Sequence, residues 1–219
     1  MSRSLSAPDL RLIVITDVAL AKPRTILEVV RAAVHAGAPA VQLRDKSAGA
    51  RELAEAGRAL LPVVRQASAL LLVNDRLDVA LAIGADGVHL GPDDLPVHAA
   101  RDAIGSTPEA GARPMLIGAS TDDPSRARRL VADGAHYIGC GTVYATTSKP
   151  DAGAAIGLDG LQRVVDAVDV PVVGIGGIDE ERAAAVAAGT GAAGVAVIGA
   201  IMRAADVERT VRALLAPWG

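Results

Sequence analysis

The sequence predicts a single domain of the α/β class, a (β/α)₈ TIM barrel, and three observations lead to that prediction. Short apolar runs recur eight times along the chain, and a stretch with helical periodicity follows each of them. Most of these runs are apolar throughout, as expected for parallel strands that are covered on both faces. No linker divides the chain, and barrels of alternating strands and helices often reach its length of 219 residues.

The eight apolar runs are the predicted strands. The helical stretches between them carry apolar residues on one face, such as Leu53, Leu60 and Val64 after the second run. Eight strand and helix units can close into a barrel, and an open doubly wound sheet is the alternative arrangement of the same units. In chain order the predicted strands are 12–16, 40–43, 69–73, 88–90, 115–118, 137–143, 172–175 and 195–198.

We expect the chain to consist of a short tail and one barrel domain. Residues 1–9 are polar and small, and we expect a flexible tail there, followed by one catalytic barrel of residues 10–219. The first apolar run is too short for a signal peptide or a membrane span, so we expect a cytoplasmic location. The stretch 105–114 is rich in Gly and Pro, leads into the fifth strand and should lie at the amino-terminal face.

Composition narrows the classes of partner. The chain has no Phe, and its aromatic residues are Tyr137, Tyr144 and Trp218, so it lacks the stacking platforms that single-stranded nucleic acid requires. The net charge is −3 with interleaved signs, which implies neither a nucleic-acid groove nor an anionic membrane patch. Cys140 is the single cysteine, and we expect a buried, inert thiol. The composition therefore implies neither a nucleic-acid partner nor a membrane partner, and it is compatible with a homo-oligomer.

Two acidic residues follow the third and fourth predicted strands. Asp75 comes at the end of the third run and Asp94 lies just past the fourth. Because the carboxyl ends of parallel strands meet at one rim, both carboxylates should converge there, where barrels bind their ligands. Two carboxylates with cations nearby suit Mg²⁺ bound to a diphosphate. In the alternative interpretation, Asp75 and Asp94 merely cap or begin the helices that follow.

Polar residues also alternate at the end of the second predicted strand. Gln42, Arg44 and Lys46 are spaced two apart, so they share one side while the strand continues. Two cations and an amide facing inward require an anion. The alternative is an internal ion pair of Arg44 with Asp17 or Asp75.

Glycines mark the ends of the seventh and eighth strands. The segments 174–178 and 194–199 are glycine-rich, and residues 200–202 begin a short helix. In barrels, the loops at these two strand ends commonly bind a phosphate through backbone amides. A tight turn with no ligand would also explain adjacent glycines.

The loop after the sixth strand, residues 144–157, is a candidate for a mobile lid because it is long and lacks apolar periodicity. It contains Thr146, Ser148 and Lys149, while Ser120 ends the fifth strand. No Ser, His and Asp arrangement and no Cys and His pair is recognisable in the sequence, which disfavours nucleophilic catalysis.

Several motifs in order resemble thiamine phosphate synthase, and the resemblance covers almost the whole chain. The matching segments are 15–17, 41–46, 73–76, 84–91, 117–121 and 175–178. The resemblance implies an Mg²⁺-dependent transferase that joins hydroxymethylpyrimidine diphosphate to thiazole phosphate or its carboxylate and releases pyrophosphate. It implies a dissociative reaction, in which the diphosphate leaves first and the thiazole nitrogen then captures the pyrimidine methylene cation.

The resemblance also implies roles for individual residues. Asp75 and Asp94 would bind Mg²⁺. The pyrimidine diphosphate would be held by Gln42, Arg44, Lys46, Asn74, Ser120 and Lys149, of which Arg44, Lys46, Ser120 and Lys149 would take part in catalysis. The thiazole phosphate site would be lined by Thr146, Ser148, Gly177, Ile198 and Gly199.

Four positions depart from the family pattern. Pro92 stands where Gln is usual, Asp122 where His is usual, Ser148 where a second Thr is usual, and Gly199 where a Ser is usual. Because Gly199 offers only a backbone amide, we expect Gly199→Ser to add a hydrogen bond and to lower the KM for the thiazole phosphate.

Two other functions fit the same barrel. A thiazole tautomerase-like enzyme would isomerise the thiazole phosphate and would not need Asp75, Asp94 or the cations after the second strand. A non-catalytic barrel that binds a phosphate ligand would show no turnover with Mg²⁺.

Overall fold

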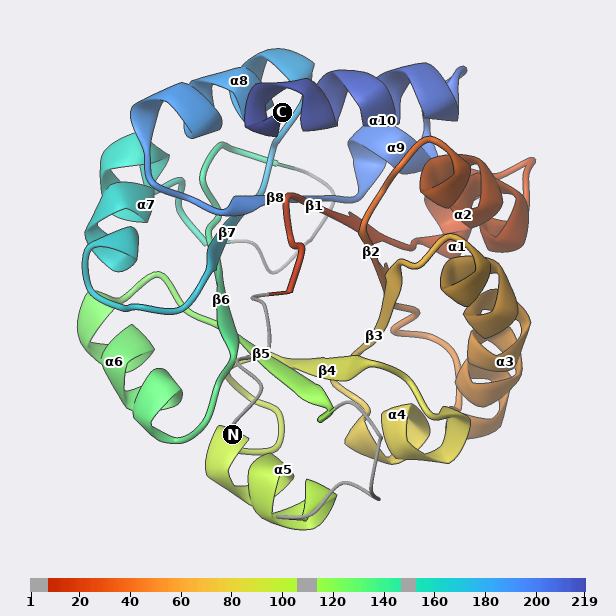
Figure 1. The fold of residues 1–219 in the computed structure, drawn as a ribbon, viewed down its shortest axis with the longest axis horizontal. Helices are drawn as coiled ribbons and strands as arrows, with labels where there is room; N and C mark the ends of the chain where they lie inside the picture. The colour runs from red at the N-terminus through yellow and green to blue at the C-terminus, as the bar shows by residue number, and fades with distance from the viewer. Residues whose placement is uncertain (1–7, 106–113, 147–152) are drawn as a thin grey trace, which may run out of the picture.

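A computed structural model describes residues 8–105, 114–146 and 153–219. Eight parallel strands pair in chain order, and β8 also pairs with β1, so the sheet closes into a barrel (Figure 1). This closure confirms the predicted barrel and excludes the open sheet. The strands are β1 Leu12–Ile15, β2 Ala40–Leu43, β3 Leu70–Asn74, β4 Gly87–Leu90, β5 Leu116–Ser120, β6 Tyr137–Cys140, β7 Val172–Ile175 and β8 Gly194–Val197.

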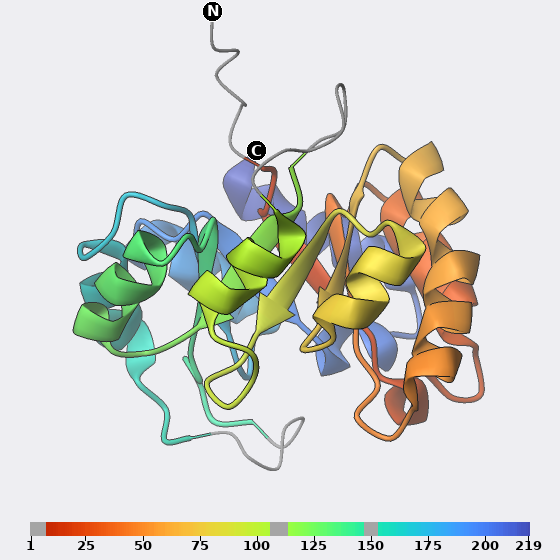
Figure 2. The ribbon, with the colours of Figure 1, turned by 90° about the horizontal axis from the view of Figure 1, so that it is seen from below.

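Helices form a ring around the strands, and the loops after β2, β4 and β6 gather at one face of the barrel, the lower face in Figure 2. That face contains the carboxyl ends of all eight strands, because the strands are parallel. The helices are α1 Val18–Ala21, α2 Ile26–His35, α3 Ala50–Gln66, α4 Leu77–Ile83, α5 Val97–Ile104, α6 Pro124–Ala132, α7 Gly157–Val165, α8 Glu180–Gly189, α9 Gly199–Met202 and α10 Val207–Leu215, with the 3₁₀ helix η1 Ala216–Trp218.

The predicted strands agree with the observed ones to within two residues, except at the end of β6. The prediction ran to residue 143, whereas the strand ends at Cys140. Gly141 has a φ of 156°, and a Cβ at this position would overlap the carbonyl oxygen of Ile175. The chain then runs beside the end of β7, where the amide of Val143 donates to that carbonyl at 2.8 Å. This close approach requires glycine and ends the strand early.

The barrel core is aliphatic, as the lack of Phe predicts, with one large exception. Tyr137 is fully buried inside the barrel. A Cβ on Gly118 of the neighbouring strand β5 would overlap the Tyr137 ring. The glycine therefore makes the space that the tyrosine ring needs in the closely packed interior.

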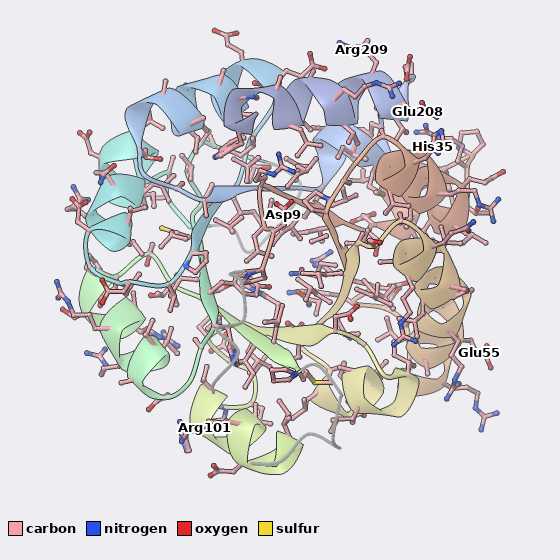
Figure 3. All side chains as sticks on the ribbon, in the orientation of Figure 1. Asp9, His35, Glu55, Arg101, Glu208 and Arg209 are labelled. Atoms are coloured by element: carbon pink, nitrogen blue, oxygen red, sulfur yellow. The ribbon has the colours of Figure 1, made fainter. Side chains whose placement is uncertain are left out.

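Polar and charged residues of the helices lie at the outer edge of the molecule, as His35, Glu55, Arg101 and Arg209 show (Figure 3). None of the helices within the described segments is long and apolar enough to span a membrane. The expectations for most of the tail and most of the 105–114 segment concern residues 1–7 and 106–113, which lie outside the described part.

Candidate active site

A cavity of about 880 Å³ opens at the face that contains the carboxyl ends of the strands. Its volume lies within the range of small-molecule sites. Gln42 is 3% exposed and does not line the cavity. Ser148 and Lys149 lie outside the described residues. The remaining predicted site residues all line the cavity: Arg44, Lys46, Asn74, Asp75, Asp94, Ser120, Thr146, Gly177, Ile198 and Gly199.

The two acidic residues at this rim do not cap helices. Helix α4 begins after Arg76 and helix α5 after Pro96, and neither N-terminus receives a side-chain cap. Asp94 instead accepts a hydrogen bond from the Gly91 amide at 2.7 Å. Asp75 adopts a left-handed backbone with a φ of 63°. This conformation is uncommon for residues other than Gly, Asn and Asp, and it recurs at ligand sites. The helix-cap interpretation is therefore wrong for both residues.

Asp75 and Asp94 interact directly, and their surroundings affect the ionisation of Asp75. The pKa of Asp75 is raised to about 6, chiefly by burial and then by the hydrogen bond and the charge of Asp94, against the opposing effect of the nearby charges of Lys46 and Arg44. Two carboxylates in contact resist double ionisation when no cation lies between them. The pair is thus arranged so that a bound cation would relieve the repulsion.

Arg44 is fixed at the end of β2 by the neighbouring strand. The Thr16 hydroxyl donates to the Arg44 carbonyl at 3.0 Å and accepts from the Arg44 amide at 2.9 Å. The guanidinium is 3.8 Å from the Asp17 carboxylate, so the internal ion pair considered from the sequence is present. Arg44 nevertheless lines the cavity. Because its only ion pair within the described residues is with one distant carboxylate, other N–H groups of its five-donor guanidinium stay available for an anion.

The cavity floor contains a polar network that the sequence did not predict. His89 is 9% exposed and bridges the Tyr137 hydroxyl, 2.9 Å from Nδ1, and the Ser120 hydroxyl, 2.8 Å from Nε2. Burial raises the pKa of Tyr137, and a hydrogen bond with Gln42 lowers it to a smaller extent. A Cβ on Gly139 would approach the His89 ring to 2.9 Å, so glycine is needed beside it.

The network contains a Ser and His pair, Ser120 with His89, but it is not a Ser, His and Asp arrangement. Its third member is Tyr137, whereas a nucleophilic triad uses a carboxylate to stabilise the imidazolium. The phenol stays neutral because its pKa is raised. The pair therefore forms a hydrogen-bonding floor and lacks the group that would activate Ser120 as a nucleophile.

The opposite end of the cavity is built largely from backbone. Gly176 and Gly177 have φ values of 103° and 63°, which allow the tight turn after β7. Arg182 of α8 donates from Nη1 to the Gly177 carbonyl at 2.6 Å and lies 4.8 Å from the Tyr144 ring centre. The turn after β7 is thereby joined to the loop after β6.

The donors present fit one kind of metal site. Within the three described segments, no group of three or more His, Cys, Asp or Glu side chains could hold a metal ion alone. Mg²⁺ is usually bound through one or two carboxylates, with water and substrate phosphate oxygens completing its shell. The Asp75 and Asp94 pair matches that donor set.

Known proteins of one family are similar to this chain in sequence and in structure. Residues 12–201 match the family model described as thiamine monophosphate synthase. Thiamine-phosphate synthase of Moorella thermoacetica is 47% identical over 94% of this chain and 95% of the relative. The corresponding protein of Chloroflexus aurantiacus is 46% identical over 95% of this chain and 92% of the relative.

Solved structures are also similar to this chain. Thiamine phosphate pyrophosphorylase from Pyrococcus furiosus has a TM-score of 0.83 at 41% identity, covering 96% of both chains. The enzyme of the same name from Bacteroides thetaiotaomicron, at 15% identity and a TM-score of 0.64 over 94% of this chain and 97% of that chain, supports the fold alone. The chain therefore belongs to the thiamine monophosphate synthase family.

Proposed function

We propose that this protein joins hydroxymethylpyrimidine diphosphate to thiazole phosphate or its carboxylate in an Mg²⁺-dependent reaction. The products are thiamine phosphate and pyrophosphate, and CO₂ is also released when the carboxylate is the substrate. One observation carries the proposal beyond family membership. The contacting carboxylates of Asp75 and Asp94 share one end of the cavity with Arg44 and Lys46, whose charges act on Asp75. That combination suits a metal-bound diphosphate, because cations and metal together neutralise a highly charged leaving group.

Asp75 and Asp94 would hold the metal ion. When bound, Mg²⁺ would neutralise charge on the diphosphate oxygens and favour departure of that group. Asp75 must be ionised to bind it, and the nearby cations Lys46 and Arg44 favour the ionised form. Asn74, which ends β3 beside them, adds an amide at the same end of the cavity.

The chemistry needs no protein nucleophile. The bond between the pyrimidine methylene carbon and the diphosphate oxygen breaks, and the electron pair leaves with the diphosphate. The thiazole nitrogen then supplies the pair that forms the new carbon to nitrogen bond. Arg44 and Lys46, with Lys149 by the family resemblance, would stabilise the charge that grows on the leaving group.

The thiol and hydroxyl groups near the cavity are consistent with this scheme. Cys140 is fully buried, and burial, followed by the charge of Asp122, raises the pKa of its thiol to about 12. A protonated thiol is a poor nucleophile at neutral pH. Ser120 hydrogen-bonds His89 in a floor without a carboxylate. Ser120 and His89, which line the cavity, would orient the pyrimidine, and the bonds would break and form between the two substrates.

The thiazole phosphate would occupy the end of the cavity at β7 and β8. The family resemblance assigns Thr146, Ser148, Gly177, Ile198 and Gly199 to this subsite. Gly177, Ile198 and Gly199 belong to the two loops that commonly bind phosphate in barrels. The two substrates would then meet between the acidic end and the glycine end.

The test is a two-substrate assay that measures pyrophosphate and thiamine phosphate together. We expect equal amounts of both products, only when both substrates and Mg²⁺ are present. Isomerisation of the thiazole substrate without the pyrimidine substrate would favour a tautomerase-like enzyme. Binding of either substrate without any product would favour a non-catalytic barrel, and either result would refute the proposal.

A further inference from the structure

The glycine end of the cavity contains two arginines with very different surroundings. Arg182 is engaged by the Gly177 carbonyl at 2.6 Å, by the Asp179 carboxylate at 3.8 Å and by the Tyr144 ring. Arg203, just after α9, also lines the cavity. Its side chain makes no hydrogen bond or ion pair with any residue that the structure describes. Arg203 therefore keeps its donors available at the cavity wall.

The Arg203 guanidinium lies directly over Gly199. A Cβ built on Gly199 would overlap Nη2 and would lie 2.7 Å from Cζ and 3.0 Å from Nη1 of Arg203. The two residues are four apart, the spacing that brings side chains together on one helical face. The Arg203 amide donates to the Gly199 carbonyl at 3.1 Å, which fixes their relation. The absence of a side chain at position 199 is what admits the guanidinium.

An arginine in this position suits a phosphate monoester. The planar guanidinium presents paired N–H donors that match two phosphate oxygens, and such charge-assisted hydrogen bonds are stronger than neutral ones. The carboxylates of Asp75 and Asp94 follow β3 and β4, and β4 lies across the barrel from β8 (Figure 1). The acidic end can therefore take a metal-bound diphosphate while Arg203 meets a second, metal-free phosphate.

We propose that Arg203 binds the phosphate of the thiazole substrate and replaces the contact that the family resemblance assigns to a serine at position 199. Gly199, which has no side chain, leaves room for the guanidinium. The inference rests on the proposed function for the identity of the substrate. It also reverses the expectation for Gly199→Ser. A new side chain there displaces the guanidinium, so the added hydroxyl replaces a charged donor.

The experiment compares Arg203→Gln with Arg128→Gln, a matched control because Arg128 is exposed on α6 and does not line the cavity. Steady-state kinetics give the KM for each substrate. Calorimetry gives the Kd for the thiazole phosphate and for the corresponding thiazole alcohol, which lacks the phosphate. These Kd measurements do not depend on turnover.

For Arg203→Gln we expect the KM and Kd for the thiazole phosphate to rise about tenfold or more, the size of one lost charge-assisted contact. The KM for the pyrimidine diphosphate and the Kd for the alcohol should stay within about twofold of the parent, as should every value for Arg128→Gln. Equal weakening of the phosphate and the alcohol, or no change in either, would overturn the inference.

A second variant tests the role of the gap. Gly199→Ser should raise the KM for the thiazole phosphate in the parent, but should add no further loss in an Arg203→Gln background, because the guanidinium is already absent. A lower KM in the single variant would refute displacement. If the parent makes thiamine phosphate and Arg203→Gln behaves like the control, only this inference fails. If the parent makes no thiamine phosphate, the proposed function itself fails.

Discussion

The two ends of the cavity differ in the groups that they offer to a negatively charged substrate. At β3 and β4, contacting carboxylates are held beside Arg44 and Lys46, and Asp75 adopts a left-handed backbone. At β7 and β8, the wall consists of glycine backbone with Arg203 over Gly199. The first arrangement stores repulsion that a cation would relieve, whereas the second presents donors that are ready for an anion. One cavity can therefore hold two phosphorylated substrates, with one phosphate-bearing group at each end.

The largest effect should follow from removing a carboxylate at the acidic end. Asp94→Asn should lower kcat/KM with Mg²⁺ by about a thousandfold, because several kcal/mol of charge stabilisation depend on the metal. Asp78→Asn is the matched control, since Asp78 is exposed on α4 and paired with Arg76. Activity of Asp94→Asn near that of the parent at saturating Mg²⁺ would remove the distinction between the two ends.

A smaller loss should follow from removing a cation at the same end. Lys46→Ala should cost about 2 to 4 kcal/mol of transition-state stabilisation, the scale of one preorganised charge or donor. Single-turnover measurements isolate this step from product release. We expect the affinity for the thiazole phosphate to stay unchanged, and a parallel loss of that affinity would show that the two ends are not separate subsites.

The smallest effect concerns stability without metal. Asp75→Asn should raise the Tm at pH 8 by about 2 to 4 °C, after allowance for solvent screening of this half-buried group. The sign follows from the pKa, which is about 6 in the folded protein and about 3.9 when unfolded. The ionised carboxylate therefore costs stability above pH 6, and this cost falls as the pH drops towards 4.

Asn suits this test because it tolerates the left-handed backbone of residue 75. The gain in Tm should shrink at pH 5, and saturating Mg²⁺ should stabilise the parent more than the variant. Calorimetric scans at pH 5 and pH 8 give both comparisons. A Tm gain that is independent of pH would point to packing and away from the charge of Asp75.

The acidic end was predictable from the sequence because of the barrel geometry. Once eight strand and helix units are recognised, residues that follow adjacent parallel strands must share one rim. Asp75 and Asp94 come together for this reason, with Arg44 close by. The apolar runs also located the strands, although the early end of β6 depends on the approach of Gly141 to Ile175, a contact between segments far apart in the chain.

The floor and the glycine end were harder to predict. His89 lies within β4, where both faces are buried, so hydrophobic periodicity could not indicate that its ring reaches the cavity. Arg203 follows a helix of four residues, too short to show a polar face. Its distance of four residues from Gly199 was the available signal. The family resemblance indicates that a serine is missing at position 199, whereas the structure identifies Arg203 as the side chain that occupies the space.

Whether the diphosphate binds at the acidic end through Mg²⁺ is tested most directly by the binding of pyrophosphate, the expected leaving group. Calorimetry measures this binding with and without Mg²⁺. The parent should bind pyrophosphate tightly only with Mg²⁺, Asp75→Asn and Asp94→Asn should lose that dependence, and Arg203→Gln should bind like the parent. Metal-independent binding, or binding that is weakened by Arg203→Gln and unchanged by Asp75→Asn, would contradict the assignment of the diphosphate to the acidic end.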